Sequence, residues 1–233
     1  MMKTLIITGA SKGIGFQTAL KFLEDGYRVI NLSRTPANDD RIENHAIDLS
    51  FSDAEEQVNE LMELLLSEGE ICLVHNAAKM INDSAKDASS DGLRELLNIN
   101  VMAPHILNQA VLKFMAPGSS IIYIGSTLSE KAVANSYSYV TSKHAVVGMM
   151  RATCQDLANT GIHTVCVCPG FTDTEMLRTH VGEDAEILKH IAALSTFNRL
   201  VTPEEIATAI QFAGQNPVLN GAVMHTNLGQ IES

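Results

Sequence analysis

The glycine-rich segment Thr8–Gly15 constrains the fold of this chain more than any other feature. It directly follows the apolar run Leu5–Ile7 and directly precedes residues that are apolar at helical spacing, so it predicts a turn between a strand and a helix. Glycines let a backbone turn tightly and approach a ligand, and the free N–H groups of the next helix can bind a phosphate. The segment therefore predicts a dinucleotide-binding turn, although a tight turn that only needs small residues would show the same pattern.

Apolar runs alternate with amphipathic segments along the rest of the chain. The predicted strands are Leu5–Ile7, Arg28–Leu32, His45–Leu49, Ile71–Val74, Ser120–Ile124, Ile162–Cys168 and Ala222–His225. One predicted helix directly follows the glycine-rich turn. The others run over 53–67, over 93–115 with an interruption near Pro104, over about 137–159, and onward from Pro203, which follows the N-cap Thr202.

This alternation predicts an α/β fold of the doubly wound Rossmann type. We expect a single domain over residues 1–233, with a mostly parallel, seven-stranded sheet and helices on both faces. Residues 171–200 show little strand character, which predicts an insertion or lid on the substrate side.

Composition narrows the class of protein. The 233 residues are 45% hydrophobic and carry a net charge of −11, which argues against non-specific binding of nucleic acid or of an anionic membrane surface. A strand is predicted almost at the N-terminus and no apolar run reaches membrane-spanning length, so we expect a cytoplasmic protein. The four cysteines form no CxxC pair; Cys72, Cys166 and Cys168 lie in apolar runs and are expected to be buried free thiols, with no metal site.

Two cations indicate which dinucleotide would bind. The second predicted strand is followed by Ser33 and Arg34, where an acidic residue would bind the ribose 2′-hydroxyl of NAD. Arg34 and Lys12 would instead meet a 2′-phosphate, so the sequence favours NADP(H). The alternative is that both are solvated surface cations.

Polar residues near the later strands form a second group, whose side chains could take part in catalysis. Tyr139 and Lys143 are spaced four residues apart in a predicted helix, so they share one face. A lysine ammonium near a phenol lowers the pKa of the phenol from about 10 toward neutrality, where proton exchange with a carbonyl is efficient. Ser126 ends the fifth predicted strand, and Asn100 lies in the preceding helix. A surface Tyr–Lys pair and ordinary capping by Ser126 or Asn100 are the alternatives.

Taken together, these motifs resemble the short-chain dehydrogenase/reductase family over nearly the whole chain. The TGxxxGxG turn is matched by Thr8–Gly15, the YxxxK pair by Tyr139 and Lys143, and the catalytic serine and asparagine by Ser126 and Asn100. The cofactor-binding residues that the resemblance implies are Gly9, Ser11, Lys12, Gly13, Ile14, Gly15, Arg34, Asp48, Leu49, Asn76, Ala77, Tyr139, Lys143, Pro169, Gly170, Thr172 and Thr174.

One motif departs from the family pattern. The usual NNAG after the fourth strand is His75-Asn76-Ala77-Ala78 here, and whether Ala78 is tolerated depends on its φ angle. His75 stands where the family has a structural asparagine, so we do not expect it to act as an acid or base. His144 is expected to pack or to face solvent.

The resemblance implies hydride transfer between NADP(H) and a carbonyl or alcohol. Ser126 would bind the carbonyl oxygen, Tyr139 would donate a proton, Lys143 would assist Tyr139 and hold the nicotinamide ribose, and Asn100 would anchor a water. The residues expected to line a largely apolar substrate pocket are Leu128, Tyr137, Phe171, Met176, Leu177 and Phe197.

The apolar pocket favours a small or medium neutral ketone, aldehyde or diketone, and the chain resembles the pteridine- and benzil-reductase-like branch. A 3-oxoacyl-carrier reductase and a non-catalytic NADP(H)-binding redox sensor are the alternatives. The resemblance also implies a homodimer or homotetramer, for which the helical residues Ala145, Val146, Met149 and Met150 could supply a face.

Overall fold

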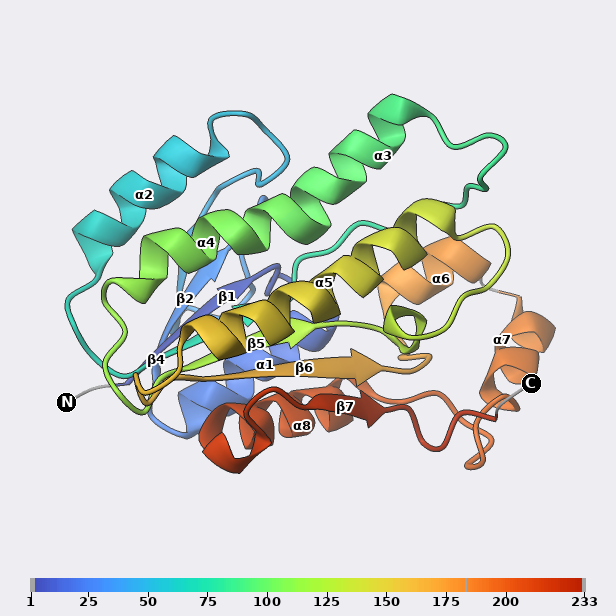
Figure 1. The fold of residues 1–233 in the computed structure, drawn as a ribbon. Coiled ribbons are helices and arrows are strands. Elements are labelled where there is room, and N and C mark those ends of the chain that lie inside the picture. The colour runs from blue at the N-terminus through green and yellow to red at the C-terminus, as the bar shows by residue number, and fades with distance from the viewer. Residues whose placement is uncertain (1–2, 183, 232–233) are drawn as a thin grey trace.

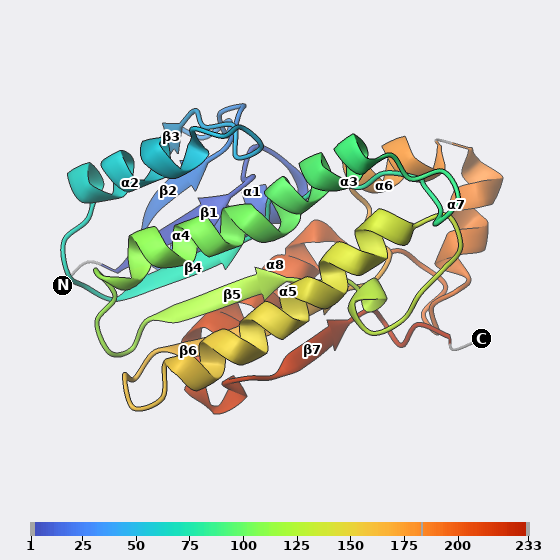
Figure 2. The ribbon, with the colours of Figure 1, turned by 45° about the horizontal axis from the view of Figure 1, so that its top comes forward.

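The computed structural model describes residues 3–182 and 184–231 and contains one parallel sheet. Seven strands lie in the order β3-β2-β1-β4-β5-β6-β7, which confirms the predicted fold class (Figure 2). The strands are β1 (Thr4–Thr8), β2 (Arg28–Leu32), β3 (Ile42–His45), β4 (Ile71–His75), β5 (Ser120–Ile124), β6 (His163–Pro169) and β7 (Val223–Thr226).

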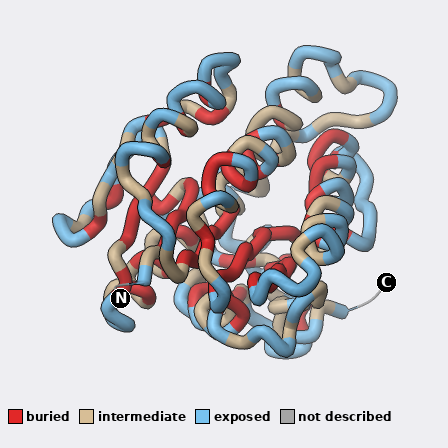
Figure 3. The backbone as a smooth tube through the Cα atoms, turned by 60° about the vertical axis from the view of Figure 1, so that its left-hand side comes forward, coloured by how far each residue is buried: buried red, intermediate tan, exposed pale blue. Residues whose placement is uncertain are grey.

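Helices cover both faces of this sheet because neighbouring residues of each strand point to opposite sides (Figure 1). On one face, Ile6 and Leu73 belong to the core under α2 (Ala54–Leu65), α4 (Ala103–Leu112) and α5 (Tyr137–Asp156). On the other face, Leu5 and Cys72 belong to the core under α1 (Gly13–Glu24) and α8 (Pro203–Gln215). The buried backbone in Figure 3 accordingly runs through the sheet and the inner sides of these helices.

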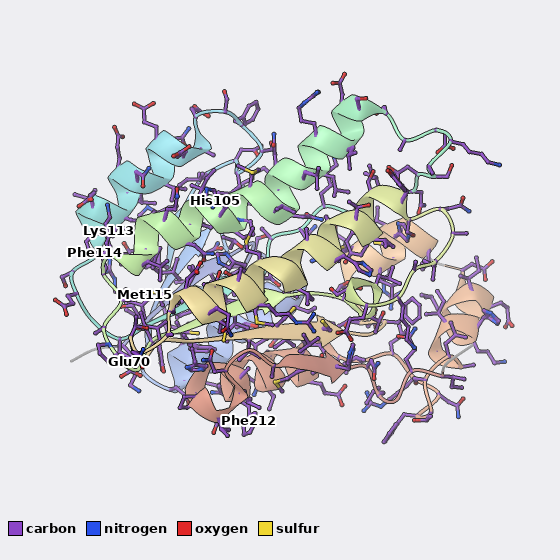
Figure 4. All side chains as sticks on the ribbon, in the orientation of Figure 1. Glu70, His105, Lys113, Phe114, Met115 and Phe212 are labelled. Carbon is purple, nitrogen blue, oxygen red and sulfur yellow. The ribbon has the colours of Figure 1, made fainter. Side chains whose placement is uncertain are left out.

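Shorter helices stand where the strands end. Helices α6 (Glu175–Val181) and α7 (Ala185–Ala192) lie beyond the carboxyl ends of β5, β6 and β7 (Figure 1). They occupy the segment expected to form a lid, and that role stays a prediction. Glu70, Phe114 and Met115 mark the opposite, amino edge of the sheet (Figure 4).

The third predicted strand was wrong in its position. Residues 42–45, rather than 45–49, pair with β2, from Val29↔Ile42 to Leu32↔His45. This strand lies at the edge of the sheet and is polar, with Glu43 bound to Arg28 and Asn44 bound to Asn31. Ile47 and Leu49 are buried in the loop that follows, and their apolar character gave the misleading signal.

The helix predicted over 93–115 is interrupted as expected, but by a wide turn. The chain passes from α3 (Ser90–Leu97) through the π-helical turn η1 (Asn98–Met102) into α4. Pro104 stands at the start of α4 and has no N–H to offer the carbonyl of Asn100 four residues back. The interruption therefore falls on Asn100.

The predicted capping of α8, the start of α5 and the free cysteines are confirmed. Thr202 and Glu205 form a reciprocal capping box at the start of α8, and α5 begins at Tyr137 as expected but ends at Asp156. All four cysteines are free. Within the described residues, no helix is long and apolar enough to span a membrane, and no three His, Cys, Asp or Glu side chains are grouped to hold a metal ion.

Candidate active site and cofactor turn

The glycine-rich turn adopts a conformation that requires its glycines. Gly9 and Gly13 have φ angles of 70° and 59°, in the left-handed region. A Cβ atom on Gly15 would lie 2.4 Å from the carbonyl oxygen of Gly9, so any side chain there would clash. The turn is therefore tight enough to bring α1 directly against the end of β1.

Side chains from neighbouring strands hold this turn. Thr8 Oγ1 accepts the backbone N–H groups of Asn76 and Ala77 at 3.0 and 2.9 Å. The side-chain amide of Asn76 donates to the carbonyls of Thr8 and Gly9, both at 3.0 Å. Ala78 is not among the residues with positive φ in the described chain, so alanine is tolerated where the family usually has glycine.

Sequence reasoning missed Asn31, which also holds the turn. This buried side chain in β2 accepts the backbone N–H of Ala10 at 2.9 Å and donates to Asn44 at 2.8 Å. A polar residue inside the apolar run Arg28–Leu32 was the signal that could have identified it.

The start of α1 suits an anion. Lys12 stands at its N-cap with an extended backbone and no side-chain capping bond, and the first turn contains no acidic residue. By contrast, side chains of Ser89, Thr174 and Thr202 cap α3, α6 and α8. The first N–H groups of α1 are therefore left for a phosphate, and the residues present fit a dinucleotide.

The two cations expected to select NADP(H) both face carboxylates. Lys12 Nζ lies 2.6 Å from Glu175 Oε1, and Arg34 Nη1 lies 4.0 Å from Asp48 Oδ2. Partial burial opposes ionisation of Asp48, but hydrogen bonds from Ser50 and the nearby Arg34 guanidinium lower its pKa. Both cations are exposed, so a ligand can compete for them.

Helix α5 buries the Tyr139–Lys143 pair. Their exposed fractions are only 8% and 3%, so the alternative of a surface pair is wrong. Lys143 Nζ donates to the carbonyl of Ile124 at 2.7 Å and lies 5.5 Å from the centre of the Tyr139 ring. This hydrogen bond fixes the ammonium group at the end of β5, just before Ser126.

Ser126 begins a short 3-10 turn, η2 (Thr127–Ser129). Its hydroxyl accepts the N–H of Leu128 at 3.1 Å, and its own N–H donates to Ser129 Oγ at 3.1 Å. The expected capping role is thus present, and the turn holds the hydroxyl at the carboxyl edge beside the residue that Lys143 contacts.

Asn100, in η1, ties the loop after β4 to α5. Its side chain accepts the N–H of Lys79 at 2.8 Å and donates to the carbonyl of Lys79 at 3.0 Å and to Ser142 Oγ at 2.9 Å. Ser142 in turn donates to the carbonyl of Tyr139 at 2.8 Å. The side chain of Asn100 is therefore fully occupied in holding the helix that carries Tyr139.

Two thiols lie directly beneath the serine turn. Cys166 and Cys168 are fully buried with their sulfurs 3.7 Å apart, and a Cβ atom on Gly125 would lie 2.8 and 2.6 Å from them. The hydrogen bond between the thiols lowers the pKa of Cys168 and raises that of Cys166. Because Gly125 has no side chain, the backbone can pass close to these two sulfur atoms just before Ser126.

His75 belongs to the core rather than to the site. Its Nε2 lies 2.8 Å from Asn108 Oδ1, and the Asn108 amide donates to Tyr123 at 2.7 Å. Burial lowers the pKa of His75 to about 4, although the Asn108 bond opposes this shift. His144 is exposed, and its Nδ1 lies 2.9 Å from the carbonyl of Val140 within its own helix.

The segment after β6 packs against the glycine-rich turn and against the chain that follows β7. Gly170 packs against Asn227, since a Cβ atom on Gly170 would lie 2.7 Å from that of Asn227. Thr174 caps α6, and its Cγ2 would lie 3.4 Å from a Cβ atom on Gly13. The predicted cofactor residues thus follow the carboxyl ends of β1, β2, β4 and β6, lie in the loop after β3, or belong to α5, except Pro169, which is the last residue of β6.

Three of the six expected substrate-pocket residues are largely open to solvent. Tyr137, Met176 and Phe197 are 45%, 43% and 65% exposed. A cavity of about 300 Å³ next to Ser126 is lined instead by residues that sequence reasoning did not select, namely Thr127, Glu130, Lys131, His225, Asn227 and Gln230.

Comparisons with known proteins agree with this geometry. Residues 9–230 match the family model described as enoyl-(acyl carrier protein) reductase. The chain is 26% identical to the 3-oxoacyl-[acyl-carrier-protein] reductase FabG of Vibrio harveyi, over 97% of this chain and 96% of that protein. A short chain dehydrogenase family protein from Francisella tularensis subsp. tularensis SCHU S4 superposes with a TM-score of 0.91 at 25% identity, covering 98% of each chain. ElxO, solved with NADP bound, gives a TM-score of 0.85 at 26% identity, also over 98% of each chain.

Proposed function

The chain belongs to the short-chain dehydrogenase/reductase family, and we propose that it uses NADPH to reduce a small or medium neutral ketone, aldehyde or diketone to an alcohol. One observation carries this proposal: Lys143, buried beside Tyr139, is fixed by the carbonyl of Ile124 at the point where the chain turns into Ser126. A protein that only binds the cofactor would not need Tyr139, Lys143 and Ser126 placed together in this way.

The cofactor would lie across the carboxyl edge of the sheet. The uncapped start of α1 would hold its phosphates, Lys12 and Arg34 a 2′-phosphate, and Asp48 and Leu49 the adenine. The segment Pro169–Thr174 would hold the nicotinamide end. NADP in the related ElxO supports this choice of cofactor. When bound, NADPH supplies the hydride.

The side chains would then handle the proton and the carbonyl oxygen. Ser126 would donate a hydrogen bond to that oxygen, and the hydroxyl of Tyr139 would give it a proton as the carbon is reduced. Lys143 would hold the ribose and replenish the proton. The carbonyl of Asn100, which Pro104 leaves without its usual helical N–H partner, would hold the water that we expect there.

A 3-oxoacyl-carrier reductase is the second candidate. It is favoured by the relative from Vibrio harveyi, which matches 97% of the chain under that name. The chemistry at the carbonyl would be the same, and only the recognition of the thioester carrier would differ. The complete set of Asn100, Ser126, Tyr139 and Lys143 argues against a non-catalytic redox sensor.

We also propose a homo-oligomer and a cytoplasmic location. Val146 and Met150 belong to the core and cannot supply a subunit face, which corrects part of the expected surface. Ala145 is exposed and Met149 half-buried on α5, and they remain candidates for that face. The free state of all four cysteines supports a reducing compartment.

A panel assay tests the proposed function. NADPH oxidation is followed by absorbance with neutral ketones, aldehydes and diketones, and with a 3-oxoacyl thioester, and is repeated with NADH. We expect turnover of at least one neutral carbonyl and slower turnover with NADH. Turnover of the thioester alone would favour the second candidate, and tight NADPH binding without any turnover would favour the sensor.

A further inference from the structure

We propose that the cavity at the end of β7 binds a hydroxyl-bearing part of the carbonyl substrate. This cavity, the β7 cavity, has a volume of about 300 Å³ and is lined by Thr127, Glu130, Lys131, His225, Asn227 and Gln230. Its volume lies at the lower end of the range for ligand pockets, ~300–1,000 Å³. The proposal rests on the proposed function and names the class of substrate that the site would take.

The β7 cavity lies between two parts of the candidate active site. On one side, Thr127 directly follows Ser126, whose hydroxyl would bind the reacting carbonyl. On the other side, Asn227 packs against Gly170, in the segment that would hold the nicotinamide. A substrate with its carbonyl at Ser126 would therefore extend into this cavity.

The charges of the lining are partly balanced. Glu130 lies 2.8 Å from His225 Nε2 and 3.6 Å from Arg151 Nη2, so the carboxylate has two cationic or potentially cationic partners. The lining holds one carboxylate, Glu130, and one ammonium group, Lys131, so their formal charges cancel. A neutral ligand fits this balance, and the net charge of −11 on the whole chain disfavours an anionic one.

The remaining polar groups present donors as well as acceptors. Asn227 Oδ1 already accepts the N–H groups of Gly229 and Gln230 at 3.1 and 3.4 Å, so its amide nitrogen is the end that offers donors. Gln230 also lines the cavity, and its Oε1 is shielded from solvent and has no hydrogen-bond partner within the described part of the chain. Rotation of the Gln230 side chain would turn this acceptor toward a ligand in the cavity.

Hydroxyl groups match this lining best, because each one donates and accepts a hydrogen bond. An apolar group would strip water from the lining without replacing its hydrogen bonds, which is unfavourable. A site built to hydrogen-bond a hydroxyl also rejects an analogue that lacks it. We therefore expect a neutral hydroxyketone or hydroxyaldehyde in place of a purely apolar ketone.

A matched pair of ketones tests the proposal. Erythrulose and butanone have the same carbon skeleton, and only erythrulose carries hydroxyl groups. We expect kcat/KM with NADPH to be at least ~10-fold higher for erythrulose, which corresponds to about one hydrogen bond. Gln230→Met keeps the side-chain length but removes the amide, and should lower the erythrulose-to-butanone ratio by ~10-fold. Thr127→Val, which removes one hydroxyl, should lower it in the same direction, whereas Gln155→Met, exposed on α5, should leave it unchanged.

Failure of the subsite can be told apart from failure of the proposed function. Equal kcat/KM values for the two ketones, or a ratio that neither Gln230→Met nor Thr127→Val changes, would overturn the subsite while leaving carbonyl reduction intact. If neither ketone is reduced, binding of erythritol, an alcohol that reduction of erythrulose would give, is measured by saturation-transfer NMR in the presence of NADPH, which cannot oxidise it. Saturable binding that Gln230→Met abolishes would still support the subsite, and absence of binding would overturn it.

Discussion

The carboxylate of Asp83 accepts the backbone N–H of Ser138 at 2.9 Å, one residue before Tyr139. Its second oxygen accepts the hydroxyl of Ser138, which is fully buried. Ser136, at the N-cap of α5, makes no side-chain capping bond of its own. The helix that presents Tyr139 is therefore capped by a residue from the loop after β4, the same loop that holds the glycine-rich turn through Asn76.

Loss of this cap should disturb catalysis more than cofactor binding. Removal of an N-cap side chain costs about 1 kcal/mol, and a small displacement of Tyr139 would lower kcat. We expect Asp83→Ala to reduce kcat by ~10-fold or more with a smaller change in KM for NADPH. Asp83→Asn retains one acceptor oxygen for the Ser138 N–H and should recover part of the loss.

Asp87 provides the matched control for Asp83. It lies in the same loop, and its carboxylate likewise accepts a backbone N–H and a hydroxyl, but both come from Ser84. Asp87→Ala should therefore leave kcat within about twofold of the unmodified enzyme if its contribution is local stability alone. Equal losses of kcat in the two alanine variants would show that Asp83 acts through loop folding and does not position Tyr139.

Tyr139→Phe should remove the proton donor without removing the cofactor site. The ring is buried beside Lys143, and the substitution deletes only the hydroxyl. General acid catalysis contributes ~10²–10⁴-fold, so we expect kcat to fall by that factor while the Kd of NADPH, measured by fluorescence titration, changes little. Activity close to that of the unmodified enzyme would contradict the assignment of Tyr139.

Arg34 should contribute to the choice between NADPH and NADH. It is exposed, and its only neighbour of opposite charge within 4.0 Å in the described chain is Asp48, so a 2′-phosphate can compete for the guanidinium. We expect Arg34→Gln to lower the ratio of kcat/KM for NADPH over NADH by ~10-fold, the effect of one charge-assisted hydrogen bond. Arg41→Gln, which removes an exposed arginine bound to Asp39 at the edge of the same region, should not change the ratio.

The parts of this protein that follow from local patterns could be predicted from the sequence. Spacing within one helix paired Tyr139 with Lys143, and a glycine-rich turn after a strand located the start of α1. The β7 cavity could not be predicted this way, because its residues come from the segments 127–131 and 225–230, nearly a hundred positions apart. Asp83 was missed because it acts on a segment distant in sequence and belongs to no periodic pattern. Asn31 stood out as a polar residue in a predicted strand, but its partner Ala10 is 21 residues away, so the strand pattern could not name that partner.

The core network around His75 should make folding stability depend on pH. The pKa of His75 falls from 6.5 to about 4 on folding, so between these values the unfolded chain binds a proton that the folded chain does not. Stability contributed by neutral His75 is therefore fully present above pH 6.5 and is lost as the pH falls toward 4, by up to ~3 kcal/mol. His75→Asn places the usual residue of the family there and removes this titration.

Denaturant unfolding at several pH values can isolate this contribution. We expect the stability of the unmodified protein relative to His75→Asn to decrease as the pH falls from 7 toward 4, because only the histidine protein gains a proton on unfolding. His190→Asn makes the same substitution at an exposed position of α7, where solvent reaches the ring in the folded and unfolded chain alike. A pH-independent difference for His75→Asn, or an equal pH-dependent difference for His190→Asn, would mean that burial against Asn108 and Tyr123 does not keep His75 neutral.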